Sequence, residues 1–142
     1  MEYSFNSSKI KKLLDAEKKD FKRINLHTSL RDKVQSMIML YSEKLKSPPH
    51  FTKNSEEYFS LLYGKINCLI FNKEGKLVKN ISLDQNNNYL ILKKNTIHTF
   101  KIKSKYAAAH EILQGPFKKN NVYIPSWYHK NESYYKKLIN RK

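Results

Sequence analysis

Short apolar runs with turn residues between them restrict the fold of this chain more than any other feature. Side chains alternate between apolar and polar along several of these runs, as they do in strands that bury one face. Gly64 and the segment NKEG supply turn residues between neighbouring runs. The predicted strands are QSMIMLY, YFSLLY, KINCLIF, KLVKNISL, YLILKK, HTFKIK and YAAAHEIL. Their short, even spacing predicts an all-β sandwich or barrel.

Length and composition fit one globular domain. The chain has 142 residues, of which 39% are hydrophobic and 13% aromatic, which is too rich for a disordered protein. The longest apolar runs, such as MIML and CLIF, are far too short to span a membrane. The segment MEYSFNSSKIKK lacks the apolar stretch of a secretory signal. The single cysteine, Cys68, lies in an apolar run and is predicted to be a buried thiol of the core. A cytoplasmic protein of bacterial type is the expectation.

A helix is predicted at each end of the barrel. Residues 7–20 form a lysine-rich amphipathic segment, with Ser7 or Ser8 as N-cap and a narrow apolar stripe that packs on the outside of the barrel. RINLHTSLRDKV is interpreted as a turn region. The tail is interpreted as a short helix capped by Asn131 or Ser133. The predicted division is a helical extension at 1–20, a barrel at 21–130 and a C-terminal helix at 131–142.

His50, Glu57 and His98 stand at the heads of predicted strands. Residues two apart share a strand face, so Glu57 and His98 each lead a file of apolar residues that begins with Phe59 and Phe100, respectively. Ligands at the mouth of a packed barrel have this pattern. Two imidazoles and a carboxylate suit a divalent zinc, iron or manganese ion. The alternative is that both histidines are ordinary surface residues at loop ends.

Several segments together resemble the WbuC-type cupin-fold metalloproteins of bacterial O-antigen gene clusters. They are RINLH, PPHFTKNSEEYFSLLYG, FNKEGKLV, NTIHTF, HEILQGPF and PSWYH, in nearly the family's order between about residues 21 and 138. The resemblance implies a single cupin barrel, that is, a double-stranded β-helix or jelly roll, with short N- and C-terminal helices. It also implies a bound metal and a role in surface-polysaccharide or nucleotide-sugar metabolism.

Thr52 departs from that family's pattern, which has a second histidine two residues after the first. A threonine hydroxyl stays protonated near neutral pH and is a poor metal ligand. The predicted ligand set therefore shrinks to His50, Glu57 and His98, which still matches a two-histidine, one-carboxylate site.

Further candidates lie near the predicted mouth. The resemblance makes His27 a pocket residue and a candidate acid or base, with Arg23 and Asn25 beside it as substrate-binding residues. On the residues alone His27 is a loop histidine. Gln35 begins an alternating strand and is either a substrate-binding residue or a cap of the barrel. Glu111, the second catalytic candidate, follows small apolar residues and is either solvent-facing or buried with a partner.

The net charge of +16 raises the possibility of nucleic-acid binding. Nearly all of this charge is lysine spread along the chain, whereas arginine is the usual residue for phosphate and base contacts. The lysine, asparagine and isoleucine content suits an A/T-rich genome. No specific nucleic-acid partner is therefore predicted.

The prediction is a metal-binding cupin that binds or transforms a sugar-type small molecule. As an enzyme it would resemble a metal-dependent sugar isomerase or epimerase, with His27 or Glu111 moving protons. The alternatives are a non-enzymatic ligand-binding or regulatory cupin and, less favoured, a basic nucleic-acid-associated protein. Proteins of this fold are often dimers, although no residue here dictates a homodimer.

Overall fold

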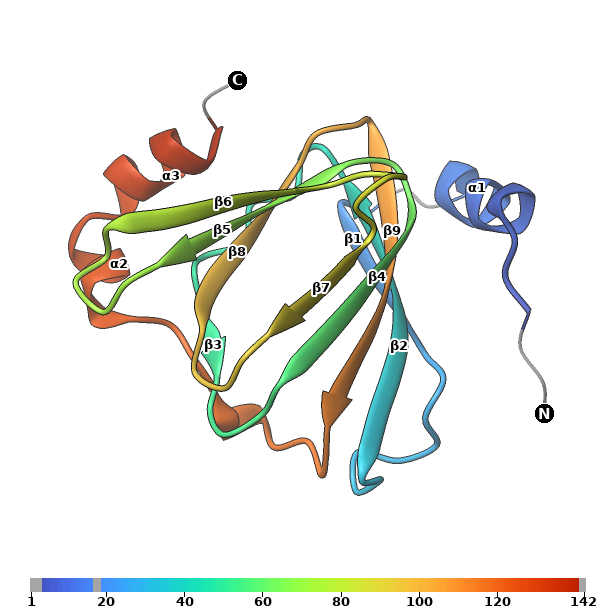
Figure 1. Ribbon diagram of the computed structural model, residues 1–142, viewed down its shortest axis with the longest axis horizontal. Helices are drawn as coiled ribbons and strands as arrows, with labels where there is room; N and C mark the ends of the chain where they lie inside the picture. Colours follow the sequence, from blue (N-terminus) through green and yellow to red (C-terminus); the bar gives the residue numbers. More distant parts are fainter. Residues whose placement is uncertain (1–3, 17–18, 141–142) are drawn as a thin grey trace.

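Two facing β-sheets form a barrel, and helices lie at both ends of the chain (Figure 1). The computed structural model describes residues 4–16 and 19–140. The larger sheet has the order β1-β2-β9-β4-β7 and the smaller one β6-β5-β8. The bounds are β1 Phe21–Asn25, β2 Val34–Ser42, β4 Glu57–Tyr63, β5 Ile66–Phe71, β6 Leu77–Leu83, β7 Tyr89–Leu92, β8 Ile97–Ile102 and β9 Tyr106–Gln114. The expected all-β cupin barrel with short terminal helices is confirmed.

A third, two-stranded sheet closes one side of the barrel. It pairs β3 (Phe51–Thr52) with β10 (Val122–Tyr123), so that Val122 lies opposite Thr52. A 3-10 turn, η1 (Lys119–Asn121), leads into β10. These segments are far apart in sequence, and their pairing brings residues near 122 to the mouth of the barrel.

The apolar residues that alternate along the strands are buried between the two sheets. On β4, Glu57, Phe59 and Leu61 are buried while the residues between them are only half-buried. Inward side chains from both sheets make the main core, which includes Met37, Met39, Tyr41, Phe59, Leu61, Cys68, Leu90, Phe100, Ala109 and Leu113. Cys68 is fully buried, and burial raises the pKa of its thiol to about 12, as expected for a core residue.

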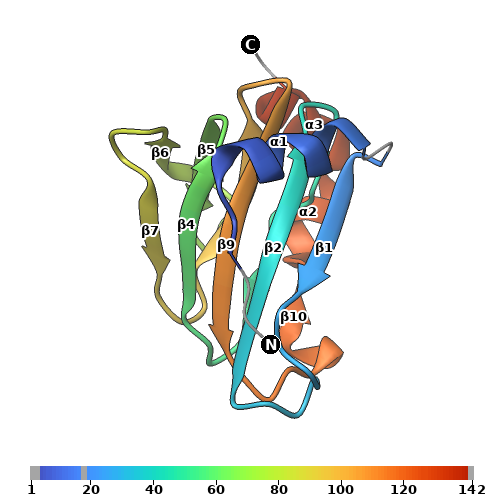
Figure 2. The same ribbon diagram turned by 90° about the vertical axis from the view of Figure 1, so that its right-hand side faces the viewer.

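The N-terminal helix α1 (Ser7–Ala16) lies across the outer face of β4, β9 and β2 (Figure 2). Ile10 and Leu14 are buried against residues such as Ile38, which confirms the predicted packing on the outside of the barrel. Neither Ser7 nor Ser8 is the N-cap. Asn6 takes that position, because its Oδ1 accepts the Lys9 backbone N–H at 2.9 Å.

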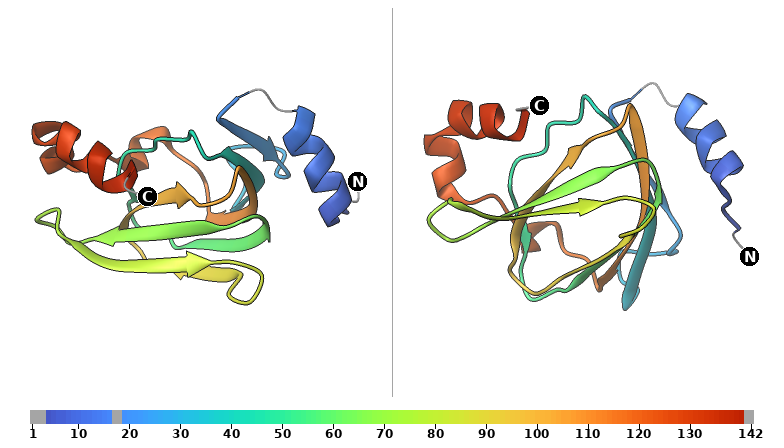
Figure 3. Two further views of the ribbon diagram at one scale, coloured as in Figure 1. Left: turned by 90° about the horizontal axis from the view of Figure 1, so that it is seen from above. Right: turned by 45° about the horizontal axis from the view of Figure 1, so that its top comes forward.

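Two helices follow the barrel, where the sequence predicted one (Figure 3). They are α2 (Ser126–Lys130) and α3 (Glu132–Asn140), which cover the outer side of β5 through Leu69 and Phe71. The Asn131 carbonyl accepts the Tyr135 N–H, so Asn131 directly precedes α3 at one of the two predicted cap positions. The short helix α2 was not predicted.

The expected turn region at RINLH is also partly wrong. Residues Phe21–Asn25 form β1, an edge strand that pairs along its whole length with β2, in a register that sets Arg23 opposite Met39. The consequence for the site is direct, since alternate residues of β1 then line the mouth of the barrel.

Candidate functional site

A cavity of about 330 Å³ opens between the sheets, beside the β3–β10 pair. Most of its wall is apolar, and the polar side chains come from segments that the fold brings together at one end of the barrel. The lining residues are Phe21, Arg23, Met39, Tyr41, Leu45, Ser47, Pro48, His50, Glu57, Phe59, His98, Phe100, Glu111, Val122 and Ile124. We call this space the main cavity.

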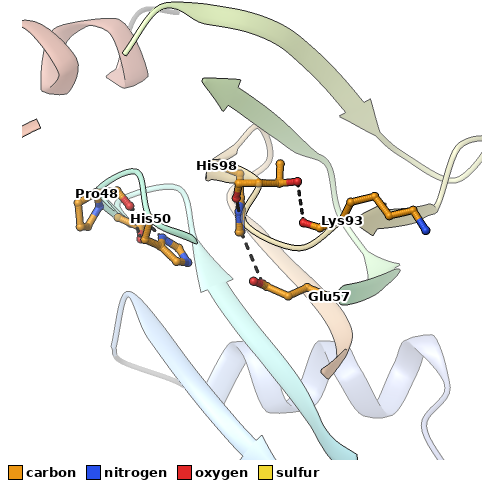
Figure 4. A network of polar contacts seen from close by, with 7 residues as sticks. Pro48, His50, Glu57, Lys93 and His98 are labelled. Atoms are coloured by element: carbon orange, nitrogen blue, oxygen red, sulfur yellow. Dashed lines mark hydrogen bonds and ion pairs between the residues drawn. The ribbon is translucent and has the colours of Figure 1, made fainter. Parts of the chain in front are cut away.

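His50 and His98 are held together as a backbone pair. Each residue donates its N–H to the other's carbonyl oxygen at 2.9 Å, and the two ring centroids lie 4.7 Å apart. Each Nδ1 lies 3.0 Å from a carbonyl oxygen two residues earlier, that of Pro48 for His50 and that of Thr96 for His98 (Figure 4). A carbonyl oxygen only accepts, so each Nδ1 carries a proton, and in the neutral form of either ring the lone pair is on Nε2.

Glu57 faces His98 across the end of the main cavity. Its Oε2 lies 3.7 Å from His98 Nε2, and both side chains are buried (Figure 4). Burial lowers the pKa of His98 to about 4, against the opposing effect of Glu57, so the ring is neutral near pH 7. A neutral Nε2 that faces a carboxylate oxygen brings two acceptors together, and a cation or a ligand donor between them would stabilise the arrangement.

One metal ion would fit between His98 Nε2 and Glu57 Oε2. The 3.7 Å separation is shorter than the roughly 4 Å that two zinc–ligand bonds span end to end, so one ion can reach both atoms. Within residues 4–16 and 19–140, however, no group of three or more His, Cys, Asp or Glu side chains lies close enough to hold a metal. Of the predicted trio, His98 and Glu57 face each other with His50 beside them, and their role as metal ligands stays a prediction.

Glu111 is a buried carboxyl group on β9, between the main cavity and a smaller one. It is 7% exposed, and no residue in the described part of the chain is its hydrogen-bond partner. Burial, helped by nearby Glu57 and opposed by Arg23, raises the pKa of Glu111 to about 8. Near pH 7 it is therefore mostly a neutral carboxylic acid, which can donate a hydrogen bond as well as accept one. Of the two expected alternatives, the structure has the buried one, without a protein partner.

The smaller space, here the side cavity, measures about 130 Å³. It shares Arg23, His50, Glu57, Glu111 and Val122 with the main cavity, so these residues form the wall between the two. Its other lining residues are Asn25, His27, Leu30, Gln35, Met37, Thr52, Leu113 and Phe117. All eight sequence-predicted site residues thus line one cavity or the other.

His27 and Gln35 are engaged with the backbone. Gln35 Nε2 donates to the carbonyl oxygens of Ser29 and Asp32, at 3.1 and 2.9 Å, and so holds the loop after β1 in place. His27 Nδ1 lies 2.9 Å from the carbonyl oxygen of Ser36 and 3.2 Å from its amide nitrogen, while Nε2 is buried without a partner in the described chain. A ligand-binding role for either residue stays a prediction.

Some cavity residues were not singled out from the sequence. Phe21 and Tyr41 contribute aromatic wall, and Val122 and Ile124 arrive from the chain after the last long strand. No apolar alternation marks Phe21, because Arg23 and Asn25 lie on the same face of β1. No local signal marks Val122, because its place depends on pairing with β3.

Comparison with known proteins supports the cupin fold. A family model described as "Domain of unknown function (DUF6016)" matches residues 7–83. No curated protein sequence matches the chain. Protein SO0799 from Shewanella oneidensis is similar in structure, with a TM-score of 0.64 and 14% identity over 96% of each chain.

Two further solved structures are similar over part of their length. DMSP lyase DddQ from Ruegeria pomeroyi DSS-3 has a TM-score of 0.60 and 14% identity, over 75% of this chain and 53% of DddQ. The capsular polysaccharide assembling protein CapF from Staphylococcus aureus has a TM-score of 0.60 and 11% identity, over 73% of this chain and 31% of CapF. These likenesses establish the fold; the WbuC-type assignment is not confirmed by them. No helix in the described chain is long and apolar enough to cross a membrane.

Proposed function

Because the chain belongs to the family described as a domain of unknown function (DUF6016), a description that assigns no activity, we propose its function from the cavities. The proposal is a cupin that binds a divalent metal and a sugar-type small molecule inside the barrel. Its setting would be surface-polysaccharide or nucleotide-sugar metabolism. The partial structural likeness to a capsular polysaccharide assembling protein supports that setting.

The pair formed by His98 Nε2 and Glu57 Oε2 carries the metal part of the proposal. Both ring Nδ1 atoms are tied to carbonyl oxygens, which orients both Nε2 atoms as ligand atoms, as second-shell bonds do in metal sites. His50 Nε2, on the ring beside this pair, is the third proposed ligand atom. A bound divalent ion would act as a Lewis acid and orient the ligand's oxygens.

The ligand part rests on the main cavity. A volume of about 330 Å³ falls within the usual range for a small-molecule site, and the wall combines aromatic rings with a few polar groups. Arg23 and Asn25 lie on β1 at the mouth. Glu111 is the better-placed proton donor, because it opens to both cavities, whereas His27 Nε2 is buried.

The metal test is elemental analysis after dialysis against a weak chelator. We expect about one divalent ion per chain in the wild type and loss of the ion in His98→Ala, since two remaining ligands hold a metal poorly. His129→Ala removes an exposed histidine outside both cavities and is the matched control. If wild type and His98→Ala contain the same trace amounts, the metal proposal is wrong.

A ligand screen with nucleotide-sugars separates the enzymatic from the non-enzymatic form of the proposal. Metal-dependent conversion of a bound nucleotide-sugar identifies an enzyme. Saturable binding without conversion identifies a binding or regulatory cupin. If no nucleotide-sugar binds the metal-loaded protein, the ligand class proposed here is wrong.

A further inference from the structure

The side cavity lies beside His50 where the small side chain of Thr52 leaves space. Its volume of about 130 Å³ equals the share of roughly four water molecules in the liquid. That space accepts a substituent of a few heavy atoms and excludes a second ring. Glu57 and Glu111 line both cavities, so the side cavity adjoins the main cavity at these two residues.

Two polar side chains that line the side cavity, Thr52 and Glu111, have unused hydrogen-bonding capacity. Thr52 is 6% exposed and Glu111 7% exposed, and neither side chain has a hydrogen-bond partner among the described residues. Among the described residues the fully buried polar atoms without a partner are His27 Nε2 and Trp127 Nε1, so the oxygens of Thr52 and Glu111 stay accessible to a ligand group. By contrast, Gln35, which also lines the side cavity, already donates two hydrogen bonds to backbone carbonyl oxygens.

Charge on the wall selects a neutral group. Glu57 lines the side cavity and disfavours an anionic substituent, because like charges at close range repel each other in a poorly solvated space. Arg23 lines the same cavity and disfavours a cationic one. A hydroxyl group is neutral, and it can donate to a carboxylate while it accepts from the threonine hydroxyl or from a protonated carboxyl.

We propose that the side cavity is a subsite for a short hydroxyl-bearing arm of the ligand, such as the hydroxymethyl group of a hexopyranose, with Thr52 Oγ1 and the Glu111 carboxyl as its hydrogen-bond partners. This inference rests on the proposed function, since it names which sugar-type ligands the barrel takes. It adds a selectivity that the main cavity alone does not supply. The protein would bind hexose units in preference to pentose units of the same configuration.

The test uses ligands that differ only at this arm. UDP-glucose carries the hydroxymethyl group, UDP-xylose has a hydrogen there, and UDP-glucuronate has a carboxylate; the galacto-configured series is measured in parallel. By calorimetry on the metal-loaded protein, we expect UDP-glucose or UDP-galactose to bind about tenfold tighter than its pentose counterpart, as expected for one satisfied hydrogen bond. The uronates should bind no better than the pentoses.

Two substitutions at Thr52 separate hydroxyl from shape. Thr52→Val keeps the volume and removes the hydroxyl, so the hexose preference should fall to near unity while pentose affinity is unchanged. Thr52→Ser keeps the hydroxyl and should retain the preference. Equal thermal unfolding temperatures for the two variants would show that a difference in their sugar affinities does not arise from a difference in folding.

The possible results separate failure of the hydroxyl subsite from failure of the proposed sugar-binding function. If hexose and pentose derivatives bind wild type equally, or if Thr52→Val keeps the preference, the subsite is wrong although sugar binding stands. Tighter binding of a uronate would show that Arg23 dominates the wall and would overturn the neutral-arm argument. If none of the nucleotide-sugars binds wild type, the proposed function itself fails and the subsite fails with it.

Discussion

Replacing Glu111 with glutamine should make the protein more stable at neutral and alkaline pH. The ordinary carboxyl pKa is 4.5, and burial raises that of Glu111 to about 8 in the folded protein. The folded state therefore binds this proton more tightly than the unfolded state. Its contribution to stability is fully present below about pH 4.5, is lost as the pH rises toward 8, and changes little above that.

The size of this effect follows from the two pKa values. A separation of about 3.5 units corresponds to about 5 kcal/mol between the limits, and to about 3 kcal/mol of that lost by pH 7. Solvent screening reduces this free-energy difference little, because the Glu111 side chain is only 7% exposed. Glutamine keeps the shape and remains neutral at every pH, so Glu111→Gln should have the smaller dependence on pH.

The assay is urea unfolding between pH 5 and 9 in the presence of a chelator, for wild type and Glu111→Gln. The difference between the two proteins is the relevant quantity, since His98 adds an opposite trend. Because the pKa of His98 is lowered in the folded protein, the free energy of unfolding decreases as the pH falls from 6.5 toward 4. We expect the variant's advantage to grow by several kcal/mol from pH 5 to pH 8. Glu43→Gln, at an exposed site outside both cavities, is the control; a flat difference for Glu111→Gln would refute the reasoning.

Three further outcomes are expected. Thr52→His places an imidazole on the wall beside His50, so it should retain more metal than wild type after dialysis against a weak chelator; unchanged retention would argue against a fourth ligand position. Gly75→Ala should lower the melting temperature by several degrees, because φ is +86° there and the new Cβ would lie 2.3 Å from Tyr135 Oη; an unchanged melting temperature would contradict this. Random duplex DNA should bind with micromolar or weaker affinity at about 150 mM salt, since the lysines are dispersed; tight, sequence-selective binding in a fluorescence titration would reverse that view.

The barrel strands could be predicted because one face of each packs against the core. Alternation on YAAAHEIL placed Ala107, Ala109 and Glu111 on one side, and all three are buried. The edge strand β1 was missed because both faces carry polar residues, so FKRIN lacks the apolar periodicity of an inner strand. Its identity comes instead from pairing with β2, which a local pattern does not contain.

The candidate site was only partly predictable for a similar reason. The predicted strand starts brought attention to His50, Glu57 and His98, and all three line the main cavity; their role as ligands stays a prediction. The raised pKa of Glu111 depends on how closely the sheets pack, and the side cavity depends on a long-range pairing that sets Val122 against Thr52. These are properties of packing, which composition and spacing do not fix.

Strand register explains why these polar side chains meet at all. Side chains alternate across a sheet, so a slip of one residue in β4 would turn Glu57 outward and replace it with Tyr58. The register that prevents this is anchored by buried Phe59, which lies opposite Glu111 on β9 and opposite Leu90 on β7. The irregularity in the β4–β9 pairing falls between Leu61 and Tyr63, beyond the site, so it does not disturb that order. The same apolar packing that stabilises the barrel therefore holds Glu57 toward His98, and a large-to-small change at Phe59 should weaken both stability and the binding that depends on this pair.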